Sequence, residues 1–123
     1  MIKLFVLSGI QGSGKTTMSK FLGEEHDAVI YTFDDIENPD LIYKFINDSL
    51  EQGRNVVFDA LNLQRNHRCS LLLNLKIPCE KICIVMATPL KECLERNLKR
   101  EGKARVLDEV IKISANMFEL PIL

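Results

Sequence analysis

Residues 3–20 read KLFVLSGIQGSGKTTMSK, and their second half carries the pattern G-x-x-x-x-G-K-[ST]. An apolar run over residues 2–7 precedes the pattern and reads as a buried strand. Met18, Phe21 and Leu22 follow at helical spacing, which predicts a helix with an inward face. A Gly-rich turn without a ligand is the alternative, but the strand before it and the helix after it favour a phosphate-binding loop.

The residue types of this loop suit the triphosphate of a nucleotide. Its glycines let backbone N–H groups point inward around an anion, and the following helix adds the partial positive charge of its N-terminus. Lys15 is expected to reach the β- and γ-phosphates, and Thr16 to place its hydroxyl on Mg²⁺. The expected nucleotide-binding residues of the loop are Gly9, Gln11, Gly12, Ser13, Gly14, Lys15, Thr16 and Thr17.

Length and composition indicate one soluble domain over residues 1–123. Apolar residues make up 46% of the chain and charged residues 27%, as in ordinary globular proteins. No apolar run approaches the roughly 20 residues that a membrane-spanning helix needs. The apolar N-terminus is too short for a signal peptide and leads directly into the phosphate loop, so we expect a cytoplasmic protein without a membrane partner.

The cysteines form no C-x-x-C pair, and a nucleotide-binding domain is normally intracellular. We therefore expect reduced thiols in the core. A zinc site with His26 and His67 is the alternative, but these spacings provide no tetrahedral set of ligands. The cysteines are Cys69, Cys79, Cys83 and Cys93.

The net charge is only −1, which argues against indiscriminate coating of nucleic acid. Its distribution is nevertheless uneven. Residues 24–53 hold nine acidic residues against one basic residue, whereas residues 54–105 hold eleven basic residues against five acidic ones. The basic region is either a solvated surface or part of a site that handles phosphate.

Strands and helices alternate along the chain, which predicts an α/β fold with a parallel sheet. The strands are expected at residues 2–7, 28–33, 55–58 and 80–86, and the helices from residue 15 and over 39–53, 64–75, 89–100 and 107–118. We expect a P-loop NTPase fold, a three-layer sandwich with strand order 2-3-1-4 and helices on both faces. The continuous apolar run of the fourth strand is typical of a strand covered on both faces.

Three groups of charged residues follow predicted elements near the expected site, at the carboxyl ends of the strands. Asp59 ends the third strand, where it either holds Mg²⁺ or caps the next helix. Asp34 and Asp35 end the second strand, where one could act as a general base and the other be a loop carboxylate. Arg96 and Arg100 lie four apart on one helix face, either as an exposed stripe or as residues that close on a triphosphate.

These motifs resemble, in order, those of the small P-loop kinases related to the kinase domain of phage polynucleotide 5′-kinase, an AAA-type P-loop kinase family. Residues 59–63, DALNL, resemble the family's D-A-T-N-L, and Arg65 and Arg68 lie in its Arg-rich continuation. Residues 94–100, LERNLKR, resemble the lid segment with two arginines, and residues 118–121, FELP, resemble a closing F-E-x-P.

The resemblance implies an ATP- and Mg²⁺-dependent kinase that transfers the γ-phosphoryl group to a hydroxyl, with a polynucleotide 5′-OH or a nucleotide as the expected acceptor. It implies that Asp34 is the general base and that Lys15, Arg96 and Arg100 act on the phosphates. Acceptor binding would involve Asp34, Asp35, Asn62 and Arg65. A small-metabolite kinase and a non-catalytic, nucleotide-dependent binding module remain alternatives.

The sequence departs from the family pattern in the part that would bind the acceptor. Glu37 stands where the polynucleotide kinases have an arginine, and Leu61 replaces the threonine of D-A-T-N-L. Between Asp35 and the helix that begins near Pro39 there is no room for the acceptor-binding helices of many relatives. The sequence thus predicts an intact nucleotide site beside a reduced acceptor site.

Overall fold

A computed structural model describes residues 1–33, 38–102 and 105–119 of the chain. Its sheet has four parallel strands in the order β2-β3-β1-β4, which confirms the predicted topology. The strands are β1 (Lys3–Ser8), β2 (Val29–Thr32), β3 (Val56–Asp59) and β4 (Glu80–Val85).

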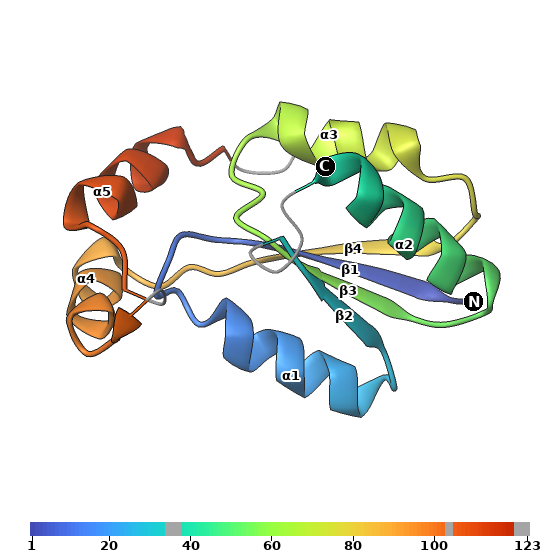
Figure 1. The fold of residues 1–123 in the computed structure, drawn as a ribbon, viewed down its shortest axis with the longest axis horizontal. Helices are drawn as coiled ribbons and strands as arrows, with labels where there is room; N and C mark the ends of the chain where they lie inside the picture. Colours follow the sequence, from blue (N-terminus) through green and yellow to red (C-terminus); the bar gives the residue numbers. More distant parts are fainter. Residues whose placement is uncertain (34–37, 103–104, 120–123) are drawn as a thin grey trace.

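Five helices surround this sheet in the described part of the chain, close to the predicted ranges: α1 (Lys15–Glu25), α2 (Pro39–Glu51), α3 (Arg65–Asn74), α4 (Leu90–Leu98) and α5 (Asp108–Met117). In Figure 1, α1 covers one face of the sheet, while α2 and α3 cover the other. The α4 and α5 helices lie together beyond the carboxyl ends of the strands (Figure 1). None of the described helices is both long and apolar enough to cross a membrane.

The central strand β1 is buried on both faces because successive side chains point to opposite sides of a sheet. Leu4 and Val6 join the core beneath α2 and α3, which also contains Ile46. Phe5 and Leu7 join the core beneath α1. This two-sided burial explains why β1 reads as a continuous apolar run rather than as an alternating one.

A third cluster connects α4 and α5 to the phosphate loop through Ile10, Cys93 and Ile111. The connection between the two helices is held by Asn97, which is fully buried. Its side-chain amide donates to the Val106 carbonyl at 2.6 Å, and its side-chain oxygen accepts from the Val106 N–H at 3.0 Å. The spacing of Leu98 from Cys93 and Leu94 predicts that it is buried with them, and this prediction is wrong, because Leu98 is 57% exposed.

The prediction that β4 is covered on both faces was also wrong. β4 lies at the edge of the sheet, and Glu80, Lys81 and Cys83 on it are exposed. Strand continuity predicts burial, but it cannot say whether a helix reaches far enough across an edge strand.

Other apolar residues that were expected in the core lie at the surface. Phe21 on α1 is 58% exposed. Leu107, which its position in the predicted helix over residues 107–118 would place in the core, lies before α5 and is 75% exposed. Among the four free thiols, Cys79 and Cys93 are buried as predicted, whereas Cys69 and Cys83 are exposed. A helical period identifies a face but does not say how wide the covered part of that face is.

Candidate functional site

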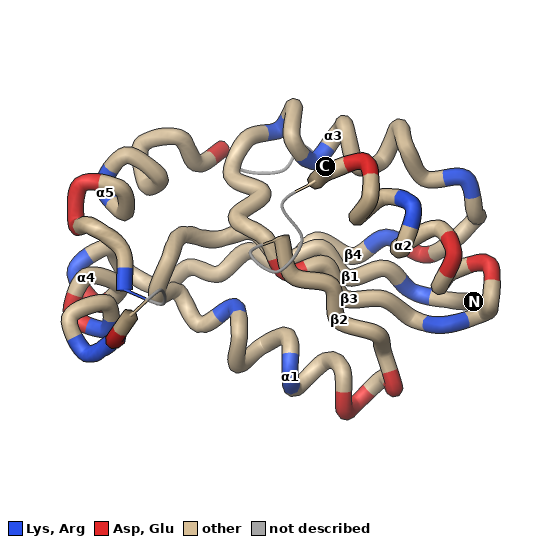
Figure 2. Tube along the Cα trace, in the orientation of Figure 1, with Lys and Arg blue, Asp and Glu red and all other residues tan. Residues whose placement is uncertain are grey.

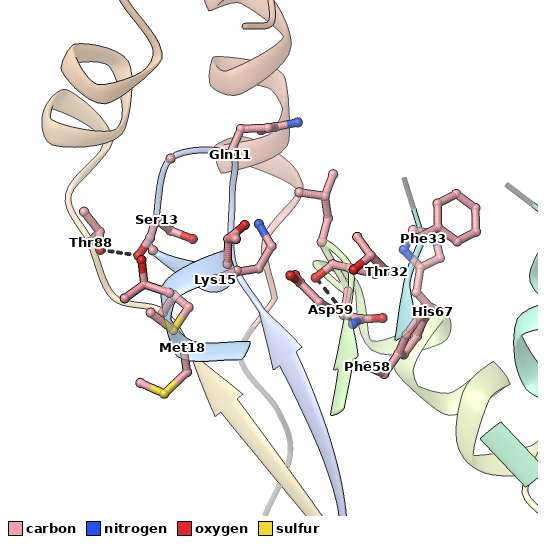
Figure 3. A pocket seen from close by; sticks show the side chains of 18 of the residues that line it. Gln11, Ser13, Lys15, Met18, Thr32, Phe33, Phe58, Asp59, His67 and Thr88 are labelled. Carbon is pink, nitrogen blue, oxygen red and sulfur yellow. Dashed lines mark hydrogen bonds between the residues drawn. The ribbon is translucent and has the colours of Figure 1, made fainter. Parts of the chain in front are cut away.

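A cavity of about 2110 Å³ opens at the carboxyl edge of the sheet. The loop after β1 and the first turns of α1 form one side, and the ends of β2 and β3 and part of α3 form another. Arg96 on α4 and Arg100 just after it form a further border. Figure 3 shows Lys15 and Ser13 on the loop side and Phe33, Phe58 and His67 on the opposite side, with Asp59 between them. Typical small-molecule sites measure about 300–1,000 Å³, so this cavity has room for two ligands side by side.

Two glycines of the loop are required by its geometry. Gly12 has φ 78°, and a Cβ placed on it would lie 2.7 Å from the Cys93 carbonyl oxygen. Gly14 has φ 96° and caps the N-terminus of α1. Because L side chains rarely adopt these angles, the loop can bring its backbone N–H groups around an anion only with glycine at both positions.

The loop is held by hydrogen bonds from segments distant in sequence. The Gly9 N–H donates to the Leu61 carbonyl at 3.0 Å, which joins the loops after β1 and β3. The Thr88 hydroxyl donates to the Ser13 carbonyl at 2.7 Å, as the dashed line in Figure 3 shows. These contacts fix the shape of the loop in the protein alone, which reduces the ordering cost of binding an anion.

The side chains expected to act on a triphosphate line this cavity. Lys15 donates from Nζ to the Ile10 carbonyl at 3.2 Å, which keeps its ammonium group beside the loop. Thr16 lies at the first turn of α1, and Asp59 lies at the end of β3 with only 7% of its surface exposed. The hydroxyl and the carboxylate are oxygen ligands, the type that Mg²⁺ prefers.

An unsatisfied polar atom supports the fit of a phosphate to the loop. The Ser13 hydroxyl is buried and has no hydrogen-bond partner within the described part of the protein. A buried hydroxyl without a partner costs free energy, which a phosphate oxygen would recover by accepting its hydrogen bond.

Among the described residues no group of three or more His, Cys, Asp or Glu could hold a metal ion. That is compatible with Mg²⁺, which usually takes one or two protein ligands together with phosphates and water.

The two predicted lid arginines, Arg96 and Arg100, line the cavity. Arg96 donates to the Gly12 carbonyl at 3.0 Å and forms an ion pair with Glu92 at 2.9 Å. Arg100 lies just after α4, at the same border of the cavity. Figure 2 shows further basic residues along α4, at the end of the molecule where the loop lies.

The residues predicted to bind the acceptor are separated in the structure. Asn62 lines the cavity, but its side-chain amide donates to the Leu7 carbonyl at 2.7 Å and so braces the end of β1. Arg65 lies apart from the large cavity: it lines a smaller one of about 260 Å³ and pairs with Glu119 at 4.0 Å. Arg65 is the first residue of α3, and from there its side chain reaches Glu119. Asp34 and Asp35 lie outside the described residues, as do Glu37, Leu120 and Pro121.

Arg68 connects the loop after β3 to the segment after α5. Its guanidinium is buried and donates to the carbonyl oxygens of Asn62 at 2.6 Å, Leu63 at 3.0 Å and Glu119. Each of these carbonyls would lose a donor if Arg68 were replaced. Arg68 is therefore a positioning residue that holds one wall of the cavity.

We expect Arg68→Leu to lower the free energy of unfolding by roughly 2–4 kcal/mol, because it removes several buried hydrogen bonds from a charged donor, each worth about 1.5–3 kcal/mol. The loss stays below their sum because the Asn62 carbonyl keeps the Ser8 hydroxyl and the Leu63 carbonyl keeps the Glu119 N–H as donors. The melting temperature should fall by about 10 °C. Arg65→Leu is the matched control, because its exposed ion pair should contribute less than about 1 kcal/mol. Urea denaturation of both variants measures the difference, and equal destabilisation would contradict the role assigned to Arg68.

Several lining residues were missed from the sequence. Thr88 could have been found, since it follows β4 at the carboxyl edge where α/β sheets place their sites. Phe33 could have been found in the same way, since it follows β2 at that edge. Tyr43 and His67 carried no such signal, because they come from two different helices that only the fold brings together. Burial, together with the nearby Asp40 carboxylate, raises the pKa of the Tyr43 phenol, which keeps it protonated.

Residues 4–121 match the model of the AAA domain family AAA_33. The chain belongs to this family. The family match confirms the relationship that the motifs predicted, and the AAA domain spans nearly the whole chain. No curated protein matches the sequence at a significant level.

Solved structures with the same fold as this AAA domain include kinases. An unliganded sugar kinase from Janibacter sp. HTCC2649 has a TM-score of 0.82 and 17% identity, covering 99% of this chain and 80% of the kinase. A chain of the Pnkp1/Rnl/Hen1 RNA repair complex has a TM-score of 0.83 and 21% identity, covering 94% of this chain and 43% of that chain. Kti12 from Chaetomium thermophilum, in complex with ADP-AlF3, has a TM-score of 0.75 and 14% identity, covering 97% of this chain and 81% of Kti12. The similarity shows that this AAA domain has a P-loop kinase fold.

Proposed function

We propose that this AAA domain is an ATP-dependent kinase that transfers the γ-phosphoryl group to a hydroxyl, with a polynucleotide 5′-OH or a nucleotide as acceptor. The observation that carries the proposal is that one cavity contains both the phosphate loop with Lys15 and, facing them, a second end lined by other elements. A phosphoryl-transfer enzyme needs a donor site and an acceptor site that meet at the transferred group. A protein that only binds a nucleotide needs the first site alone.

In the proposed reaction the acceptor oxygen bonds to the γ-phosphorus as the bond to the β–γ bridging oxygen breaks, and ADP leaves. Asp34, by its resemblance to the family's base, takes the proton of the acceptor hydroxyl. Lys15 and the loop N–H groups hold the phosphates in line with the acceptor, and Asp35 contributes to acceptor binding. Thr16 and Asp59 would hold Mg²⁺, which neutralises charge on the phosphates. Arg65 has no part in this proposal, because it lies at the second cavity.

The lid arginines give a testable prediction. If Arg96 and Arg100 neutralise charge that develops during transfer, Arg96→Lys and Arg100→Lys should each lower kcat by about 10-fold or more with little effect on the KM for ATP. Lysine keeps the charge but loses the planar fork that meets two phosphate oxygens. Gly102, at φ 59°, would let the lid segment of residues 94–100 close over the bound nucleotide and open again.

Steady-state kinetics with varied ATP separate kcat from KM for these variants. Lys99→Ala is the matched control, since this exposed side chain lies between the two arginines in sequence. If both arginine variants turn over at the wild-type rate, Arg96 and Arg100 do not act on the phosphates and are an exposed basic stripe instead.

Two other functions have specific support. The sugar kinase among the structural neighbours favours a small-metabolite kinase. The connection between Thr32 at the end of β2 and Pro39 at the start of α2 favours a nucleotide-dependent binding module, because its length leaves no room for the acceptor-binding helices of many relatives.

Incubation with γ-labelled ATP and a panel of 5′-OH oligonucleotides, nucleosides, nucleotides and sugars separates these three functions. Label on an oligonucleotide, nucleoside or nucleotide supports the proposal. Label on sugars alone supports the metabolite kinase. Measurable ATP binding without label on any acceptor supports the binding module.

A further inference from the structure

The end of the large cavity away from Lys15 is aromatic. Phe33 follows β2, Tyr43 lies on α2, Phe58 lies in β3 and His67 lies on α3, and all four line the cavity. In Figure 3 Phe33, Phe58 and His67 gather on the side opposite the phosphate loop, with Asp59 toward the loop. We call these four residues the aromatic end of the cavity.

Hydrogen bonds position the backbone that carries two of its members. The Phe33 N–H donates to the Asp59 carbonyl at 3.2 Å, so the backbone of Phe33 is joined to that of Asp59, the residue expected to hold Mg²⁺. Tyr43 lies one turn into α2, a helix whose start is fixed because the Asn38 side chain accepts from the Asp40 N–H at 3.0 Å. Phe33 is 36% exposed despite its position in the cavity, which leaves ring surface for a ligand.

The positively charged side chains of the cavity lie at one of its ends. The described Lys and Arg side chains that line it are Lys15, Arg96 and Arg100, all on the side of the phosphate loop and α4. At the aromatic end the described side chains carry phenyl, phenol and imidazole groups, and the hydroxyls of Thr32 and Ser70 lie beside them. A sugar acid would meet no lysine or arginine there among the described residues. A flat, uncharged ring would meet aromatic faces and hydroxyl groups, the combination that binds nucleobases.

We propose that the acceptor carries a nucleobase, and that Phe33 and Tyr43 bind this base while its sugar hydroxyl is directed toward the phosphates. This inference rests on the proposed kinase function, and it adds the residues that select the base of the acceptor. The shared chemistry is base stacking, and the base can belong to a free nucleoside or to the 5′-terminal residue of a strand. The protonated phenol of Tyr43 can also donate a hydrogen bond to the edge of the base.

The test measures binding and transfer separately. Calorimetry with Mg²⁺ and a non-hydrolysable ATP analogue gives the affinity for nucleosides, for 5′-OH oligonucleotides and for ribose, and kinetics give the acceptor KM. Phe33→Leu and Tyr43→Leu keep apolar side chains but remove a ring. Each should weaken nucleobase binding by about 10- to 100-fold, as alanine substitution of stacked aromatic residues does, with ATP affinity unchanged.

Phe45→Leu is the matched control, because it removes a ring from the same helix at a residue that stacks on Tyr31. It should lower stability without changing acceptor affinity. The wild-type protein provides a test that needs no variant: nucleosides should bind at least about 10-fold more tightly than ribose. Preference for nucleosides or for oligonucleotides identifies the source of the base, and either supports the inference.

Nucleoside binding without any phosphoryl transfer would refute the proposed kinase while supporting the aromatic end as a base site. Transfer to sugars with unchanged affinity in Phe33→Leu and Tyr43→Leu would support a kinase and overturn this inference. Ribose bound as tightly as nucleosides by the wild type would overturn it as well.

Discussion

Lys15→Ala is expected to lower the rate of phosphoryl transfer by about 10²- to 10³-fold, the loss typical of removing one group that stabilises transition-state charge. Lys15 is held at the loop by its contact with the Ile10 carbonyl, in the cavity that Asp59 and Arg96 also line. Alanine removes a charge-assisted contact with the phosphates in both the bound state and the transition state. ATP affinity should therefore fall too, by about 10-fold or more.

Transfer of label from γ-labelled ATP and equilibrium binding of ATP measure the two losses. Lys20→Ala is the matched control, since this exposed lysine lies on the same helix, more than one turn from Lys15. A Lys15→Ala protein that turns over at the wild-type rate would show that the loop does not act on the transferred phosphate.

Asp34→Asn is expected to separate binding from chemistry. A general base contributes about 10²- to 10⁴-fold to the rate, so transfer should fall by that factor while ATP affinity stays close to that of the wild type. Asparagine has nearly the same shape as aspartate but cannot accept the proton of the acceptor hydroxyl. The prediction rests on the family resemblance, because Asp34 lies outside the described residues.

Asp35→Asn distinguishes the two members of the acidic pair. It should leave the chemical step nearly unchanged if Asp34 is the base. If Asp35→Asn gives the larger loss of rate, the assignment within the pair is reversed. If Asp34→Asn weakens ATP binding as much as Lys15→Ala does, Asp34 belongs to the metal site instead.

The nucleotide end of the cavity could be predicted from the sequence because its determinants are local. The loop pattern, the strand before it and the helix after it lie within residues 3–20, and Gly12 and Gly14 adopt the positive φ angles that explain their presence. The parallel sheet and its order followed from the alternation of elements and the family resemblance, and both are confirmed.

The opposite end of the cavity could not be predicted, because it depends on contacts between distant segments. Arg65 and Arg68 are indistinguishable as sequence letters, yet Arg68 is buried under three backbone carbonyls while Arg65 pairs with Glu119. Phe33 and Tyr43 would read as core residues, and only the positions of β2 and α2 bring both to the cavity. A hydrophobic period gives the direction of a side chain relative to its own element, but not what lies opposite it.

The most direct test of the proposed kinase is the balance of products. ³¹P NMR of the wild-type protein with Mg²⁺, ATP and a nucleobase acceptor follows ADP, free phosphate and new phosphate monoester in one sample. The proposal predicts that ADP and the monoester form in equal amounts, with little free phosphate and with no monoester in the Lys15→Ala protein. ADP that appears only with free phosphate, or an ATP signal that does not change although ATP is bound, would contradict phosphoryl transfer to this class of acceptor.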